Sequence, residues 1–135
     1  MTEKYGIVVA SHGVFCEELI RSAQMIFGQL PDVASVALKG DMSPEAFGEQ
    51  LRTACKAFDD RVIVLCDIFS GTPFRMAAML SQEIPDMILL TGVNMPMLIN
   101  AAELRNCTAP EKLAEQIVEE SKESIVDVMK AMNEN

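Results

Sequence analysis

The sequence predicts an α/β fold in which a mainly parallel sheet carries helices on both faces. Four short apolar segments rich in β-branched residues recur along the chain, and segments with the apolar spacing of helices lie between them. The short segments are apolar throughout, which is typical of strands buried on both sides. Strands and helices that alternate in this way form a doubly wound sheet with right-handed crossovers. We therefore expect a single domain over residues 1–135.

Each of the four apolar segments has the length of one strand in a small domain. The predicted strands are Gly6–Ala10, Val33–Leu38, Val62–Cys66 and Met87–Leu90.

The first two predicted helices have clear boundaries. The first ends at Gly28, since glycine commonly terminates helices. Ser43 is the expected N-cap of the second, with Pro44 at its first helical position. The buried stripe of the first helix is formed by Cys16, Leu19, Ile20, Ala23, Ile26 and Phe27, and that of the second by Phe47, Leu51, Ala54, Cys55 and Phe58.

Three later helices are predicted from the residues that begin them. Proline is well tolerated in the first helical turn, and it marks starts at Thr72-Pro73 and at Asn94-Met95-Pro96. The next helix is predicted to begin at Thr108, because Glu111 three residues later completes a capping box.

The tail from Ser124 to Met132 has two interpretations. Ile125, Val128, Met129 and Met132 have helical spacing, whereas Val126 and Val128 alternate as in an edge strand. The sequence leaves both alternatives open.

Composition and charge exclude several classes of protein. The net charge of −9 and the lack of a Lys/Arg cluster argue against nucleic-acid binding, which depends on clustered cations. An acidic surface suits a basic protein partner, although it also simply keeps small proteins soluble.

The expected location is the cytoplasm. The four cysteines form no C-x-x-C pair and lie mostly in apolar runs, as buried thiols of a reducing compartment do. The N-terminal residues lack the layout of a signal peptide, and the apolar runs are too short to cross a bilayer.

His12 is the first candidate site residue. Ligands of parallel sheets bind at the carboxyl ends of the strands, and the only histidine of the chain follows the first strand there. Gly13 lets the backbone approach closely, and a helix N-terminus follows, which favours an anion such as a phosphoryl group without any metal. The alternative is a histidine that only packs or caps.

Asp67 is the second candidate, because it ends the third predicted strand. A carboxylate beside a buried apolar run needs a hydrogen-bond donor, and an imidazole N–H would fix the tautomer of His12 and leave its other nitrogen as the nucleophile. The alternative is a carboxylate that caps its own turn.

Ser70, Gly71 and Thr72 precede the helix at Pro73 and form a second candidate anion-binding turn. The same residue types are also ordinary in loops. Apolar side chains flank these turns and suggest a docking surface for a partner, although core packing is the alternative for each: Phe15, Phe69, Phe74, Met95 and Met97.

Three of the turns together resemble those of the mannose-type (mannose/fructose/sorbose) enzyme II A component of the sugar phosphotransferase system. They are Val9-Ala10-Ser11-His12-Gly13, Asp67 to Phe74 (DIFSGTPF) and Thr91 to Leu98 (TGVNMPML). The likeness runs over the whole chain.

The resemblance implies a phosphoryl carrier. His12 would accept a phosphoryl group from the phosphocarrier HPr and pass it to the B component, which phosphorylates the incoming sugar, and Asp67 would be the hydrogen-bonding partner of His12. The protein would then be a phosphotransferase without a cofactor or metal, and it would meet the membrane only through the transporter.

The resemblance also implies a homodimer in which a C-terminal strand is exchanged, and the tail is where that strand would lie. A two-faced sheet of four strands also leaves an exposed edge that a second copy would cover. Some family members continue through a Pro/Ala-rich linker into a B domain, and without such a linker before Asn135 we expect a free-standing A component.

Several other functions fit less well. An aspartyl-phosphate receiver would use Asp67 but needs an acidic pair after the first strand, where Ser11 and His12 stand. A hydrolase using Ser70, His12 and Asp67 lacks the G-x-S-x-G elbow, and no nucleotide-binding glycine motif is found. The phosphotransfer subunit of a dihydroxyacetone kinase is the nearer alternative, because it resembles this chain in using a histidine after the first strand.

Overall fold

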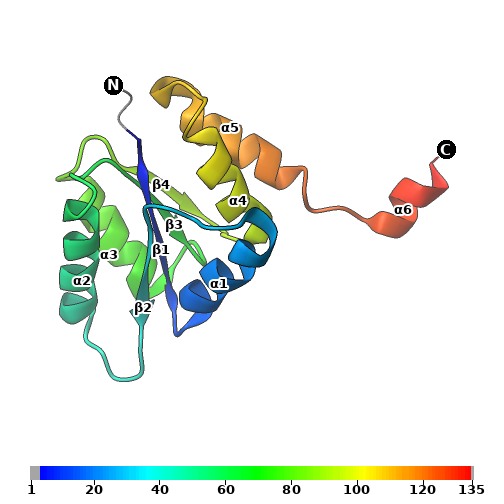
Figure 1. Ribbon diagram of the computed structural model, residues 1–135. Helices are drawn as coiled ribbons and strands as arrows, with labels where there is room; N and C mark the ends of the chain where they lie inside the picture. Colours follow the sequence, from blue (N-terminus) through cyan, green and yellow to red (C-terminus); the bar gives the residue numbers. More distant parts are fainter. Residues whose placement is uncertain (1–3, 135) are drawn as a thin grey trace.

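The computed structural model describes residues 4–134. In it, four parallel strands form one sheet, as the sequence predicts. The strands are β1 (Gly6–His12), β2 (Val33–Leu38), β3 (Val62–Cys66) and β4 (Ile88–Thr91). Their order across the sheet is β2-β1-β3-β4, and every neighbouring pair is parallel (Figure 1). The order reverses beside β1, so the carboxyl ends of β1 and β3 lie next to each other where ligands of such sheets bind.

The helices are α1 (Phe15–Phe27), α2 (Pro44–Lys56), α3 (Gly71–Ser81), α4 (Met95–Leu104), α5 (Pro110–Lys122) and α6 (Val128–Asn133). Helices α2 and α3 cover one face of the sheet, and α1, α4 and α5 cover the other (Figure 1). Each layer therefore buries its own apolar core against the sheet.

The central strands supply alternate side chains to the two cores. Ile7 and Val9 of β1 pack with α1, α4 and α5, whereas Val8 and Ala10 pack with α2 and α3. Strand β3 is buried throughout, but β2 and β4 are only partly buried because each has a neighbour on one side only. The expectation of strands buried on both faces thus holds for the central pair.

Strand β1 is longer than predicted. Ser11 and His12 continue the pairing with β2, opposite Ala37 and Leu38. The apolar pattern stops at Ala10, but the backbone hydrogen bonds of the sheet do not depend on side-chain polarity. His12 is therefore the last residue of a strand rather than part of a free loop.

The predicted starts of α2 and α4 are confirmed. The Ser43 hydroxyl accepts a hydrogen bond from the backbone N–H of Ala46 at 3.1 Å, and the Asn94 side chain accepts one from that of Met97 at 2.9 Å. Both contacts satisfy N–H groups that the first helical turn leaves without a partner. Gly28 ends α1 with a positive φ of 89°, as predicted.

Some local predictions are wrong. Helix α5 begins at Pro110 after Ala109, and the capping box of Thr108 and Glu111 is not formed. The Thr108 N–H instead bonds to the Leu104 carbonyl, so Thr108 closes the turn that follows α4. In α1, Ile26 is 68% exposed rather than buried, because the stripe that meets the sheet is narrower than the periodicity suggests.

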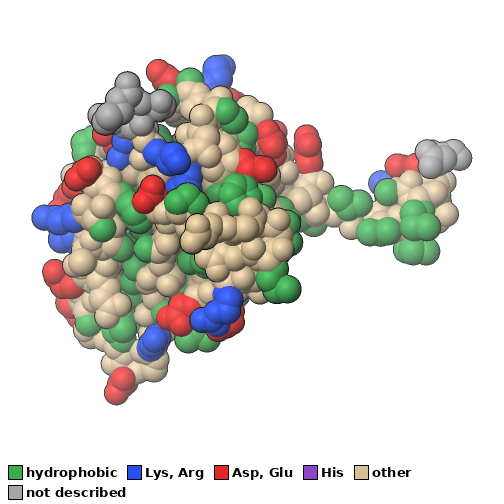
Figure 2. Space-filling view, viewed as in Figure 1, with side chains coloured by type: hydrophobic (Ala, Val, Ile, Leu, Met, Phe, Trp, Pro, Cys, Tyr) green, Lys and Arg blue, Asp and Glu red, His purple; other side chains and the backbone are tan. Residues whose placement is uncertain are grey.

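The tail forms an arm that extends away from the two-layered body (Figure 1). Helix α6 occupies Val128–Asn133, so the helical alternative is correct there, and no strand is found between residues 123 and 134. Apolar side chains are visible along the arm in the space-filling view (Figure 2), and five large ones are exposed: Ile125, Val126, Val128, Met129 and Met132. None of the helices formed by residues 4–134 has both the length and the apolarity needed to cross a membrane.

Arg105 lies near the beginnings of the strands, at the opposite end of the sheet from His12. This buried side chain donates to the backbone carbonyls of Tyr5 at 2.9 Å and Asp32 at 3.2 Å, and also to that of Pro31. It connects the end of α4 to the beginnings of β1 and β2, which are far apart in the sequence.

Candidate functional site

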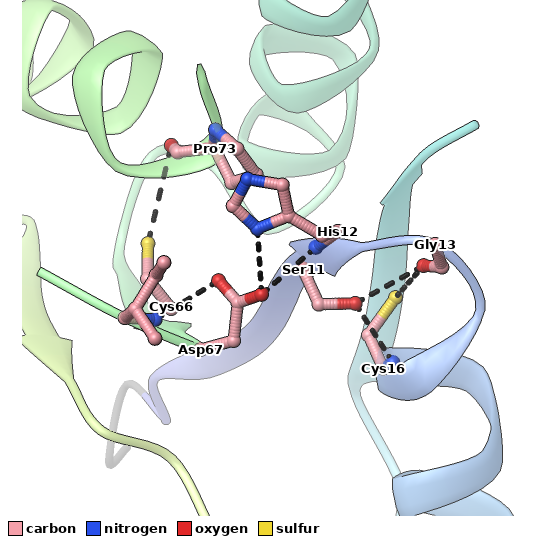
Figure 3. A network of polar contacts seen from close by, with 8 residues as sticks. Ser11, His12, Gly13, Cys16, Cys66, Asp67 and Pro73 are labelled. Carbon is pink, nitrogen blue, oxygen red and sulfur yellow. Dashed lines mark hydrogen bonds and ion pairs between the residues drawn. The ribbon is translucent and has the colours of Figure 1, made fainter. Parts of the chain in front are cut away.

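His12 and Asp67 meet at the carboxyl ends of the two central strands. The ring Nδ1 of His12 lies 2.8 Å from Oδ2 of Asp67, and the backbone N–H of His12 donates to the same oxygen at 2.9 Å. Figure 3 shows the ring with Asp67 on one side and Pro73, at the beginning of α3, on the other. The two residues are 55 positions apart in the chain, and the pairing of β1 with β3 brings them together.

The carboxylate of Asp67 has two roles. Its Oδ1 accepts the backbone N–H of Ile68 at 3.0 Å, so it caps its own turn as well as holding His12. Partial burial would raise the pKa of Asp67, but the hydrogen bonds from the His12 backbone, the His12 ring and Ile68 lower it below its ordinary value of 3.8. The side chain is therefore an anion at neutral pH.

This arrangement selects one tautomer of the His12 ring. An ionised carboxylate only accepts hydrogen bonds, so the nitrogen that faces it, Nδ1, carries the proton. In the neutral ring, Nε2 then holds the free electron pair. The side chain of His12 is 45% exposed, which leaves this nitrogen accessible to a partner.

Gly71 lies against the ring. It has a positive φ of 86°, and a Cβ added there would lie 2.7 Å from Nε2 of His12 and 2.8 Å from Cε1. Any side chain at this position would displace either the ring or the start of α3. Gly71 thus allows the beginning of α3 to approach Nε2 of His12 closely.

The other residues predicted to bind phosphate are Ser70, Thr72 and Gly13, and each makes different contacts. Ser70 occupies the N-cap position of α3 without making a side-chain cap, and it is exposed. The Thr72 hydroxyl is 3.4 Å from the guanidinium of Arg75. Gly13 adopts a positive φ of 61°, but its N–H donates to the Leu38 carbonyl at 2.7 Å and so already has a partner.

Ser11 is a site residue that the sequence reasoning missed. It is fully buried, and its hydroxyl accepts the backbone N–H of Cys16 at 2.9 Å and donates to the Gly13 carbonyl at 3.1 Å. These contacts fix the turn between His12 and α1 (Figure 3). A serine within an apolar strand was the available signal, because a buried hydroxyl requires partners.

Apolar side chains surround His12 at the surface. Val14, Phe15, Ile68 and Phe69 are exposed, and the Phe69 ring packs edge-on against Phe74 with 5.0 Å between centroids. Met97, in contrast, is buried in the core. Of the predicted docking residues, Phe15 and Phe69 are exposed, Phe74 and Met95 are half-buried, and Met97 belongs to the core.

Neighbouring thiols are poor nucleophiles. Burial raises the pKa of the Cys66 thiol, beside Asp67, to about 12, and burial also raises that of Cys16. Among residues 4–134, no group of three or more His, Cys, Asp or Glu side chains is placed to hold a metal ion.

Comparison with known families agrees with this geometry. The family model described as "PTS system fructose IIA component" (EIIA-man) matches residues 6–118. This chain belongs to that family. The match includes β1 through most of α5 and contains both His12 and Asp67.

Characterised members of the EIIA-man family are similar in sequence. The fructose-specific EIIA component of the phosphotransferase system of Bacillus subtilis is 30% identical over 120 residues, which are 87% of this chain and 82% of that protein. The mannose-specific EIIAB component of Escherichia coli K12 is 26% identical over 102 residues. The match covers 74% of this chain but only 32% of that longer protein.

Solved structures of the EIIA-man family share the fold. The EIIA component from Streptococcus agalactiae superposes with a TM-score of 0.86 and 28% identity, over 93% of this chain and 98% of that one. The mannose/sorbose-specific IIA subunit from Enterococcus faecalis gives a TM-score of 0.81 and 27% identity, over 91% of this chain and 93% of that one. The protein is thus a phosphotransferase-system IIA component of the mannose family.

Proposed function

We propose that this protein carries a phosphoryl group on Nε2 of His12, accepting it from HPr and passing it to the B component of a sugar transporter. The observation that carries the proposal is the 2.8 Å contact between Nδ1 of His12 and Asp67, which leaves Nε2 as the free nucleophile of the sole imidazole. The protein would act in the cytoplasm and meet the membrane only through the transporter.

The proposed transfer is an in-line exchange between two imidazoles. The electron pair of Nε2 attacks phosphorus, a new N–P bond forms, and the N–P bond of the donor histidine breaks with its electron pair returning to the donor nitrogen. The proton on Nδ1 of His12 stays in place, and Asp67 stabilises the positive charge that the ring gains. Such a transfer needs positioning and charge stabilisation rather than covalent help.

Two alternatives are less well supported. Family membership favours the sugar phosphotransferase system over a dihydroxyacetone kinase subunit. A receiver would phosphorylate Asp67, but both of its oxygens already accept hydrogen bonds from His12 or Ile68.

The proposal is tested by phosphorylation from phosphoenolpyruvate, enzyme I and HPr. We expect one acid-labile phosphate on the wild-type protein and none on His12→Ala. Because phosphorus on Nε2 and on Nδ1 gives distinct NMR signals, heteronuclear spectra of the labelled protein identify the nitrogen. Absence of label on the wild type would overturn the proposal, and label that persists in the variant would point to Asp67.

We further propose that the protein is a homodimer in which the arm of one copy packs on the other. Five apolar side chains on the arm are exposed, although Ile125 also lines a cavity of its own body. A cavity of about 470 Å³ beside the edge strand β4 is lined by Leu89, Leu90 and Val118, among others, and offers an apolar surface to such an arm. Burying both surfaces would be favourable, because it removes apolar area from water.

A further inference from the structure

Arg75 is the charged side chain that the site described above leaves without a role. It lies in α3, four residues after Gly71, and is exposed. Within residues 4–134, no carboxylate lies within ion-pair distance of its guanidinium, which contacts the Thr72 hydroxyl at 3.4 Å. The guanidinium of Arg75 is therefore available to an anion on a protein with a net charge of −9.

The position of Arg75 on α3 places it on the side of His12. Residues four apart in a helix lie on the same face, with their Cβ atoms about 6 Å apart. The Cβ position of Gly71 is 2.7 Å from Nε2 of His12, so the face that carries Arg75 is the one that meets the ring. An arginine side chain spans about 6 Å from Cβ to its guanidinium, and helical side chains lean toward the helix N-terminus.

The contact with Thr72 shows that Arg75 does lean in this direction. Its guanidinium has turned back by about one helical turn, toward the beginning of α3, where Gly71 lies against Nε2. At 3.4 Å this is a long hydrogen bond, and a phosphoryl oxygen would be a much stronger acceptor for the same N–H group.

The other cation near the site is already occupied. Lys39 follows the end of β2, and its ammonium lies 3.5 Å from the Glu17 carboxylate. Arg75 is therefore better placed to change its partner when a phosphoryl group arrives.

We propose that Arg75 binds the phosphoryl group on Nε2 of His12, moving from the Thr72 hydroxyl to a phosphoryl oxygen. The inference rests on the proposed function, and it adds a residue that touches the transferred group. The guanidinium neutralises part of the phosphoryl charge in a strongly acidic protein, while it gains and loses no proton. A planar donor with a fixed charge is suited to this role.

The test compares Arg75→Gln and Arg75→Lys with Lys56→Gln, which removes the same charge at the far end of α2. Each protein is phosphorylated with enzyme I and HPr, and phosphorus NMR then follows the phosphoryl group through a pH titration without any partner. We expect Arg75→Gln to raise the pKa of the phosphoryl group by roughly one unit. Arg75→Lys should restore much of the difference, and Lys56→Gln should match the wild type.

The transfer rate from HPr provides the second measurement. We expect Arg75→Gln to slow transfer about tenfold, the effect of losing one charge-assisted hydrogen bond. A slower transfer with an unchanged phosphoryl titration would overturn the proposal, because Arg75 would then contact a carboxylate of the docked protein instead. Equal titrations and rates in all variants would also overturn it. Failure of the wild type to take up phosphate would instead refute the proposed function, so phosphorylation of the wild type distinguishes the two failures.

Discussion

At the scale of single residues, Asp67 determines what His12 can do. One carboxylate oxygen holds both the backbone and the ring of His12, and the other holds the Ile68 backbone. The two expected roles of Asp67, turn cap and histidine partner, are therefore compatible. The carboxylate that shapes the turn is the one that orients the ring.

Replacing Asp67 with Asn should slow phosphorylation of His12. The amide carries no charge to stabilise the cationic ring, and it no longer requires the proton to be on Nδ1. We expect the rate of phosphorylation to fall by at least about tenfold. The upper limit is the roughly 10⁴-fold fall seen for the equivalent change in a hydrolytic triad. The rate is measured with HPr as donor, and nitrogen NMR of the ring reports the tautomer. An unchanged tautomer and an unchanged rate would reduce Asp67 to a turn residue.

The same carboxylate should make stability depend on pH. Because the folded-state pKa of Asp67 lies below its ordinary value of 3.8, the folded protein holds this proton less readily than the unfolded chain. Its contribution is fully present above about pH 4 and is lost as the pH falls through the folded-state pKa. The difference in free energy of unfolding between wild type and Asp67→Asn should therefore shrink below about pH 4. Urea unfolding from pH 7 to pH 3 checks this, and a constant difference would contradict it.

At the scale of elements, the candidate site lies where strands β1 and β3 end and helices α1 and α3 begin. Ser11 fixes the turn into α1, and Gly71 lets α3 begin against the His12 ring. At the other edge of the sheet, Arg105 joins the end of α4 to the strands β1 and β2 through three backbone carbonyls. The candidate site and the Arg105 contacts therefore lie at opposite ends of the strands.

Replacing Arg105 with Met should destabilise the fold while sparing phosphoryl transfer. The carbonyls of Tyr5 and Pro31 would lose the Arg105 donor inside the protein, whereas that of Asp32 would keep its bond from the Ile7 N–H. We expect a loss of about 2–4 kcal/mol in the free energy of unfolding. Urea unfolding measures it, with Arg21→Met as an exposed control expected to change little. A small loss for Arg105→Met would mean that water satisfies these carbonyls.

At the scale of the whole molecule, the arm is the part that the body does not explain. Residues 4–122 form two helical layers on a sheet, whereas the arm carries apolar side chains into solvent. The edge strand β4 and the cavity beside it provide a complementary apolar surface. In the proposed dimer, a second copy of the chain would cover both surfaces.

The protein should sediment as a dimer, with twice the monomer mass of 14.8 kDa, at micromolar concentration. Val126→Asp should shift it toward monomer, because burying an unpaired carboxylate in an apolar interface is costly. Met25→Asp is the matched control, since Met25 is 89% exposed and lies on α1 rather than on the arm. A wild-type monomer would refute the dimer, and equal masses for all three proteins would show that the arm is not the interface.

The sequence by itself determined the fold class, most element boundaries and the two candidate side chains. These follow from local chemistry: apolar runs predict buried strands, and Ser43, Asn94 and proline in the first helical turn mark helix starts through contacts within a few residues. The prediction failed at Thr108, where two local hydrogen-bonding patterns were possible. Thr108 was assigned to a capping box, but its N–H completes the turn after α4.

The tertiary structure decided which atoms meet. No local pattern specifies that Oδ2 of Asp67 faces Nδ1 of His12 or that a Cβ at Gly71 would press on Nε2. These relations depend on the β1–β3 pairing and on the path of α3 across the sheet. The physical reason is that chain spacing fixes a residue's place in its own element, whereas distances of 2.8 Å between elements arise only when the elements pack.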